Sequence, residues 1–260
     1  MFDPDLDGLL LLATDTAKRA VENVLKDPPI LKEMRFDLDK DIKLEADYKL
    51  EKFIIDNIAQ QSGYPILAEE CGIVNGSGTS DVYRWIIDPL DGSLNYYRGI
   101  PMSCLSIGLW KEMDPILGVV FDFNHGETFT GLVGKGAWLN GRPIRLSEVT
   151  EKSKAVLCTG FPVSTDFSKE ALIDFVEDIR NFKKIRLLGS AALSLAYVAC
   201  GRADCYRENG IKIWDVAAGL ALVKAAGGIV RINPSNNDVV LNVEASNAKL
   251  SLIEKAFALL

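Results

Sequence analysis

The chain has 260 residues, which is enough for one large domain or two smaller ones. Its 36 acidic residues outnumber its 29 basic residues, so the formal net charge is −7. This balance argues against a general electrostatic grip on nucleic acid polymers or anionic membranes, since both need a basic surface. His125 is the only histidine, which excludes a zinc site built from several histidines. We therefore expect the chemistry to come from carboxylates, hydroxyls or bound metal.

The cysteines and the first residues indicate a soluble, cytoplasmic protein. The cysteines are odd in number and form no Cys-x-x-Cys pair, which suits free thiols in a reducing compartment. The acidic start is unlike the basic start of a signal peptide. No segment approaches the roughly 20 apolar residues of a membrane span. The five cysteines are Cys71, Cys104, Cys158, Cys200 and Cys205.

The first half of the chain predicts two helices followed by short strands. Apolar residues at helical spacing predict helices over residues 5–26 and from about residue 50 to 61. Between them, eight of the twelve residues at 32–43 are charged, which predicts a polar loop. Short apolar runs bounded by turn residues then predict strands at 65–68, 82–87, 104–110, 116–121 and 128–132.

After residue 150, predicted strands and helices alternate. The strands are expected at 155–159, 185–187, 203–206 and 229–232, and the helices at 168–181, 191–199 and 214–226. The first half is therefore predicted to be α+β and the second half α/β. Because no linker separates them, residues 1–150 and 151–260 are expected to be two subdomains of one structural unit.

The most informative segment is Asp88-Pro89-Leu90-Asp91-Gly92-Ser93, which follows an apolar strand. Pro89 restricts the turn, so the two aspartates can converge at the end of the strand. The amides of Gly92 and Ser93 would lie at the start of a helix, where anions bind. Converging carboxylates beside an anion site indicate a divalent metal bridging to a phosphate. Taken alone, the segment also fits a plain Asp-Gly turn with capping aspartates.

Two further segments place acidic residues next to apolar elements. Glu69-Glu70 follows an apolar strand, where a solvated strand end is the simpler interpretation. Asp215 follows Trp214 in the first turn of a very apolar helix, where capping alone would explain an aspartate.

In this order and at these separations, the three segments resemble the inositol monophosphatase family of the Mg²⁺-dependent, lithium-sensitive phosphatases. The resemblance covers nearly the whole chain. It implies a layered αβαβα sandwich like that of inositol monophosphatases and fructose-1,6-bisphosphatases, with an antiparallel sheet first and a mixed sheet second. It also implies a homodimer. Further matching segments are Asp41 with Asp47, Gly134–Ala137 with Asn140-Gly141, Gly189–Ala192, Glu208 and Ala225–Gly228.

The resemblance also implies a role for each matched residue. A first metal would be held by Glu69, Asp88 and the carbonyl of Leu90, and a second by Asp88, Asp91 and Asp215. A third, weaker ion would be held mainly by Glu69. A metal-activated water, oriented by Ser93 and Asp47, would attack phosphorus, so the implied catalytic residues are Glu69, Ser93 and Asp47. The implied substrate contacts are Asp91, Gly92, Ser93, Ala191 and Glu208.

Charge arithmetic agrees with a need for metal. Four of these side chains bring four negative charges into one cleft, and a phosphate monoester adds nearly two more. Like charges in a partly dry site repel strongly. Two Mg²⁺ ions would cancel the carboxylates and a third would offset the phosphate, so two to three ions are expected.

One segment departs from the family pattern. Members commonly carry threonine three residues before Asp47, where this chain has Leu44. The replacement bears on the water network around Asp47 and on the third ion, but leaves the four principal carboxylates in place.

The expected substrate is a small phosphate monoester, most simply inositol monophosphate or a similar polyol phosphate. Leu94-Asn95-Tyr96 is similar to the Thr-Asn-Phe of inositol-type members, whereas members acting on adenosine 3',5'-bisphosphate often carry Lys-Glu-Phe. Fructose 1,6-bisphosphate, histidinol phosphate and NADP are alternative substrates of relatives. A catalytically silent, metal- or phosphate-binding regulatory module is the alternative outside enzymes.

The remaining residues of note carry structural interpretations. His125 is expected in a surface turn, and Cys71, beside the glutamate pair, is either a small packed thiol or a sensor of oxidation. Arg98 can hold the preceding turn or face a partner subunit. The four tryptophans, Trp85, Trp110, Trp138 and Trp214, are expected in the core or between the subdomains.

Overall fold

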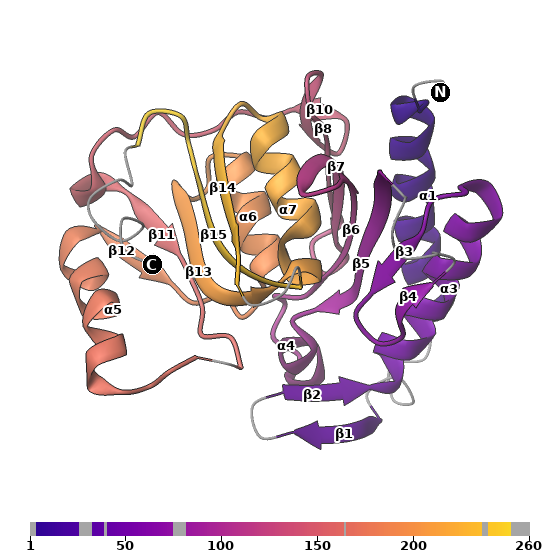
Figure 1. The fold of residues 1–260 in the computed structure, drawn as a ribbon, viewed down its shortest axis with the longest axis horizontal. Coiled ribbons are helices and arrows are strands. Elements are labelled where there is room, and N and C mark those ends of the chain that lie inside the picture. Colours follow the sequence, from indigo (N-terminus) through magenta and orange to yellow (C-terminus); the bar gives the residue numbers. More distant parts are fainter. Residues whose placement is uncertain are drawn as a thin grey trace.

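The computed structural model describes residues 4–25, 33–38, 41–74, 82–163, 165–235 and 239–250. Its elements form five layers, as Figure 1 shows. The outer layer of α1 (Leu6–Val24) and α3 (Glu45–Gln61) covers an eight-stranded sheet. Next come α6 (Ala191–Ala199) and α7 (Ile213–Ala225), then a five-stranded sheet, and α5 (Lys169–Asn181) on its far side. The predicted αβαβα sandwich is confirmed.

The eight-stranded sheet is antiparallel except for one pair of strands. Its strands, in spatial order, are β10 (Arg142–Pro143), β9 (Gly136–Leu139), β8 (Glu127–Leu132), β7 (Asp114–Asp122), β6 (Cys104–Lys111), β5 (Tyr83–Asp91), β3 (Ile66–Ala68) and β4 (Gly72–Val74). The pair β3–β5 is parallel, so the prediction of an antiparallel first sheet was wrong at that point. The chain turns back through β4 before entering β5, which makes β5 run in the direction of β3. Both strands therefore end at the same edge.

The second sheet is mixed, as expected. Its order is β12 (Lys184–Arg186), β11 (Val156–Cys158), β13 (Cys205–Lys212), β15 (Val240–Ser246) and β14 (Ile229–Pro234). The pairs β11–β12 and β11–β13 are parallel, and the other two pairs are antiparallel. The prediction ended β13 at residue 206 because polar residues follow, and it missed β15. Pairing between these two strands extends both, with a bulge at Asn209–Ile211.

The charged segment before α3 is a hairpin, so the predicted loop over residues 32–43 was wrong where the structure describes it. Strands β1 (Met34–Leu38) and β2 (Asp41–Leu44) pair antiparallel. Ile42 and Leu44 are buried, and this alternation lets one face of β2 join the core despite the charges. Residues 26–32, where the first predicted helix ends, and residues 75–81, which precede the predicted strand at 82–87, lie outside the described residues.

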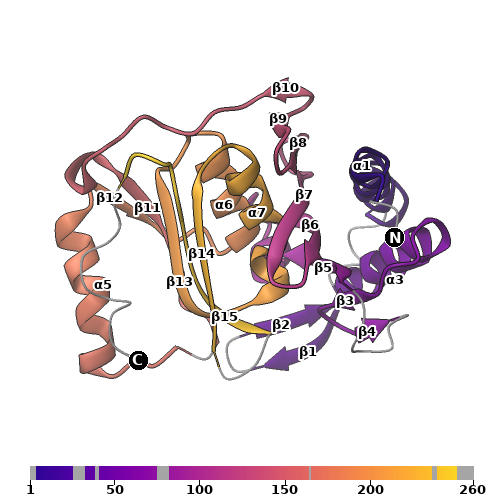
Figure 2. The ribbon, with the colours of Figure 1, turned by 45° about the horizontal axis from the view of Figure 1, so that its top comes forward.

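Helices α6 and α7 lie between the two sheets and unite the halves of the chain (Figure 2). Most of their residues are buried, because each sheet covers one side of them. Three sheet glycines, Gly108, Gly118 and Gly131, let the backbone of α7 approach closely. One hydrophobic core contains residues from both halves of the chain. None of the described helices meets the length and apolarity that a membrane crossing needs.

Candidate active site

A cavity of about 580 Å³ opens where the two halves meet, and most of the predicted site residues line it. It lies at the carboxyl ends of β3 and β5, beside the first turns of α6 and α7. Asp47 is not among the lining residues but lies behind Ser93. The predicted residues that line the cavity are Glu69, Asp88, Leu90, Asp91, Gly92, Ser93, Ala191, Glu208 and Asp215.

The parallel pairing of β3 and β5 brings Glu69 next to Asp88. Ala68 pairs with Ile87, so Glu69 and Asp88, the residues that follow them, lie at the same level of this parallel pair. Asp88 is buried, and its Oδ1 accepts a hydrogen bond of 2.9 Å from the Leu90 amide. This bond closes the turn in which Pro89 removes one backbone donor. Glu69 and Asp88, which are 19 residues apart in the sequence, are thus brought together by the register of the two strands.

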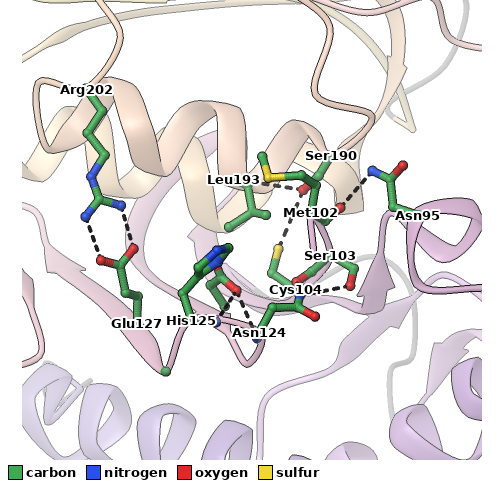
Figure 3. Close-up of polar contacts among 12 residues, drawn as sticks. Asn95, Met102, Ser103, Cys104, Asn124, His125, Glu127, Ser190, Leu193 and Arg202 are labelled. Atoms are coloured by element: carbon green, nitrogen blue, oxygen red, sulfur yellow. Dashed lines mark hydrogen bonds and ion pairs between the residues drawn. The ribbon is translucent and has the colours of Figure 1, made fainter. Parts of the chain in front are cut away.

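Asp91 is held by donors from the second half of the chain. Its Oδ2 accepts hydrogen bonds from Ser190 Oγ at 2.6 Å and from the Ala192 amide at 2.7 Å. Ser190 is the N-cap of α6 and also accepts from the Leu193 amide. Cys104 Sγ lies 3.8 Å from Ser190 Oγ, and Figure 3 shows the two side chains facing each other. Asp91 therefore fixes α6 relative to β5.

Ser93, at the start of α4 (Ser93–Arg98), is partly buried and contacts the buried Asp47 of α3. Ser93 Oγ donates to Asp47 Oδ1 at 2.8 Å and lies 2.9 Å from the Leu90 carbonyl. Asp47 Oδ2 accepts from the Leu44 amide at 2.7 Å. Leu44 thus contributes its backbone here, while its side chain belongs to the core. The replacement of threonine by Leu44 leaves the contact between Asp47 and Ser93 intact.

Burial and mutual repulsion raise the pKa values of the acidic residues. Burial raises the pKa of Asp88 and of Asp215 well above the ordinary value, and the charges of Glu69 and Asp91 add to the rise. Burial likewise raises the pKa of Asp91 to about 6 and that of Glu69 to about 7. A nearby multivalent cation would reverse these shifts, because it stabilises the ionised carboxylates.

The donor chemistry of this cluster fits a hard divalent cation. Carboxylate and carbonyl oxygens are the ligands that Mg²⁺ prefers. Within the described ranges, no three His, Cys, Asp or Glu side chains stand as close as the ligands of one metal ion. A bound cation would draw such carboxylates together, because it screens their mutual repulsion.

Lys43 and Glu51 are site residues that the sequence analysis missed. Lys43 forms an ion pair with Glu69 Oε1, and its Nζ lies 2.6 Å from Glu70 Oε1. Glu51, on α3, accepts from the amides of Glu70 and Cys71 at 2.8 and 3.0 Å. The alternation of β2 could have revealed Lys43, since it places this residue opposite the apolar face of the strand. Glu51 carried no such signal.

Glu208 lies on β13 in the wall of the cavity. Its carboxyl group packs against Gly160, where an added Cβ would lie 2.9 Å from Glu208 Cδ. Burial raises the pKa of Glu208 to about 8. The lining of the cavity also includes Phe161, Lys212 and Trp214.

His125 and the tryptophans agree with their structural interpretations, whereas Cys71 is exposed and is not the packed thiol that was expected. His125 lies in the β7–β8 turn, where its Nδ1 is 2.8 Å from Asp122, and it does not line the cavity (Figure 3). Burial and Glu51 raise the pKa of the Cys71 thiol to about 12, which disfavours the reactive thiolate. The guanidinium of Arg98 lies 5.9 Å from the ring of Tyr97. The cysteines are free thiols, Trp85 and Trp110 are fully buried, and Trp138 and Trp214 are partly buried.

Comparison with known proteins shows that this chain belongs to the phosphoric monoester hydrolases. The chain belongs to the inositol monophosphatase family, whose sequence pattern matches residues 5–255. A relative named Nus factor SuhB from Xylella fastidiosa is 41% identical over 210 residues, covering 80% of this chain and 74% of that protein. The inositol monophosphatase of Mesembryanthemum crystallinum is 36% identical, covering 97% and 95%.

Solved structures of the family share the fold. The inositol monophosphatase from Anabaena (Nostoc) sp. PCC 7120 superposes with a TM-score of 0.81 at 35% identity, covering 95% of this chain and 93% of that one. The extragenic suppressor protein suhB from Bartonella henselae also has a TM-score of 0.81, at 31% identity, covering 93% and 95%. The resemblance stated from the motifs is confirmed.

Proposed function

We propose that this protein is a Mg²⁺-dependent phosphatase that hydrolyses inositol monophosphate or a similar small polyol phosphate. The observation that carries the proposal is the convergence of Glu69, Asp88, Asp91 and Asp215 in one cavity, from β3, β5 and α7. Family membership supports the same reaction class.

The chain's own residues would divide into two ligand groups. Glu69, Asp88 and the Leu90 carbonyl would hold one Mg²⁺, and Asp88, Asp91 and Asp215 would hold a second. When bound, the ions supply Lewis-acid stabilisation of the charge on the phosphate. Asp91 is suited to its role because donors from α6 orient its carboxylate in advance.

Ser93 and Asp47 would orient the attacking water and accept its proton. The Ser93 hydroxyl donates to Asp47, which leaves lone pairs on Oγ to accept from a water molecule. Burial raises the pKa of Asp47 to about 6, although Ser93 lowers it in part, so this carboxylate can hold a proton close to neutral pH.

The remaining contacts would bind the substrate. The amides of Gly92 and Ser93 would cradle the phosphate, while the Asp91 carboxylate, the Ala191 amide and Glu208 would contact hydroxyl groups of the substrate. With a pKa of about 8, Glu208 carries a proton at neutral pH and can donate to a substrate oxygen. A polyol fits such a wall, because each hydroxyl group both donates and accepts.

Phosphate release from a panel of monoesters tests the proposal. The panel contains inositol monophosphates, adenosine 3',5'-bisphosphate, fructose 1,6-bisphosphate and histidinol phosphate, each with and without Mg²⁺. We expect Mg²⁺-dependent release, fastest from inositol monophosphate, and a loss of at least 100-fold in Asp91→Asn. Asp15→Asn, in an exposed ion pair on α1, is the matched control and should keep full activity. If no phosphate is released from any substrate at any Mg²⁺ concentration, the proposal that this protein is a phosphatase is overturned.

A regulatory role without catalysis is the second candidate, and the relative named Nus factor SuhB favours it. All four principal carboxylates and the Ser93 hydroxyl are nevertheless present. A module that only binds metal or phosphate would not need the Ser93 hydroxyl that orients the water, and the same panel separates the two candidates.

Membership of the family also supports three further proposals. We infer inhibition by lithium, a homodimer in solution and a cytoplasmic location, the last in keeping with the free thiols. Light scattering after size exclusion would measure the mass in solution, and a titration with LiCl would measure the inhibition. A monomer, or activity unaffected by lithium, would contradict the respective proposal.

A further inference from the structure

A lysine side chain lies inside the acidic cavity. Lys43 forms ion pairs with both Glu69 and Glu70, and its side chain is only 15% exposed. Its neighbours on β2, Ile42 and Leu44, are buried in the core, so the alternation of the strand keeps Lys43 on the cavity side. The ammonium group is therefore held by the fold and is poorly screened by solvent.

The two glutamates are held in place for this ammonium group. Glu51 accepts hydrogen bonds from the amides of Glu70 and Cys71, which fixes the turn after β3. The Glu70 side chain is 5% exposed and that of Glu69 is 17% exposed. Two neighbouring carboxylates with so little access to water require a cation. Without Lys43, their oxygens would form a site for a divalent ion.

We propose that the ammonium group of Lys43 occupies the cation position between Glu69 and Glu70 and so limits the active site to two divalent ions. The inference rests on the proposed function, because it concerns the metal content of that site. The charges agree with it. Without substrate, the metal-binding carboxylates Glu69, Asp88, Asp91 and Asp215 together with Glu70 carry five negative charges, which one ammonium group and two divalent ions balance.

The proposal also assigns Lys43 a positioning role. Its bond to Oε1 of Glu69 leaves Oε2 of the same carboxylate for the first metal and restrains the rotation of the side chain. Replacing the lysine by an uncharged residue would leave one carboxylate without a counterion. A further divalent ion would then enter, bound more weakly because Glu69 is shared.

Counting bound Mn²⁺ tests the inference without measuring catalysis. The full chain is dialysed against Mn²⁺, and the free ion is measured by electron paramagnetic resonance. We expect two ions in the wild type, three in Lys43→Met with the additional ion bound about tenfold more weakly, and two in Lys43→Arg. Lys52→Met changes an exposed lysine of α3 and is the matched control, with two ions expected.

The outcomes separate this inference from the proposed function. Three ions in the wild type, or two in a folded Lys43→Met protein, would overturn the role of Lys43 and leave the phosphatase intact. A wild type that binds no Mn²⁺ and releases no phosphate would instead overturn the proposed function. If Lys43→Met does not fold, as judged by circular dichroism, the number of Mn²⁺ ions bound by the wild type still tests the inference. Two bound ions support it, and three overturn it.

Discussion

The close approach of α7 to the eight-stranded sheet makes Gly118→Ala a sharp test of how the fold positions the site. A Cβ added at Gly118 would lie 2.8 Å from the carbonyl carbon of Ala218, 2.9 Å from its Cα and nearer still to its oxygen. Carbon atoms in contact normally lie about 3.5–4.0 Å apart, so helix and sheet must separate by roughly 1 Å. Backbone atoms cannot rotate away, unlike the end of a side chain.

The expected cost is at the upper end of that seen for overpacked cores, about 3 kcal/mol of the free energy of unfolding. For a chain of this length, this corresponds to a fall in Tm of about 6–12 °C. Because α7 carries Asp215 in its first turn, the Mg²⁺ concentration for half-maximal activity should rise as well. The loss of stability and the change in metal dependence would both result from the separation of α7 from the sheet.

Urea unfolding followed by circular dichroism measures the change. Gly63→Ala is the matched control, because its Cβ would meet nothing within 4 Å, and it should alter stability by less than about 0.5 kcal/mol. A Gly118→Ala protein as stable as this control would refute the reasoning that α7 is held by backbone contact with β7.

Three further predictions concern charge and metal. Glu208 has a pKa of about 8 against an ordinary 4.5, so its contribution to stability is complete below pH 4.5 and is lost as the pH rises to 8. In urea unfolding without metal, the free energy of unfolding of Glu208→Gln should therefore exceed that of the wild type by up to about 3 kcal/mol at pH 7, and the two should be equal at pH 4.5. A difference in stability that does not change with pH would contradict this. Ser190→Ala removes the N-cap of α6 and a hydrogen-bond donor to Asp91. It should lower the free energy of unfolding by about 1–2 kcal/mol and raise the Mg²⁺ concentration needed for activity. A loss of stability with unchanged metal dependence would contradict the link between Ser190 and the site. Mg²⁺ at 100 times its Kd should stabilise the wild type by about 2.7 kcal/mol in thermal unfolding, and Asp91→Asn should lose most of this gain.

Local patterns in the sequence were enough for the helices and the acidic motifs. The prediction for α6 matches its observed bounds, because an apolar helical run begins at the Ser190 cap. The segment Asp88–Ser93 also follows from local chemistry, since proline and glycine restrict the turn whatever surrounds it. A helix is closed by hydrogen bonds within its own segment, which explains why such elements can be read from the chain alone.

Strand partners depended on the tertiary structure. A strand bonds to a neighbour that can be distant in sequence, so apolar runs predicted strands but not their order. The hairpin of β1 and β2, the pairing of β13 with β15 and the parallel pair β3–β5 were missed for this reason. The last of these brings Glu69 beside Asp88.

The sequence by itself determined the net charge of −7, the family and the carboxylates of the candidate site. It also showed that a single histidine was no obstacle, because the proposed chemistry needs none. Only the tertiary structure decided that Lys43 stands against Glu69 and Glu70 and that Asp91 is oriented by the first turn of α6. These contacts join segments 26 to 101 residues apart, and their energies depend on burial, which a local pattern does not contain.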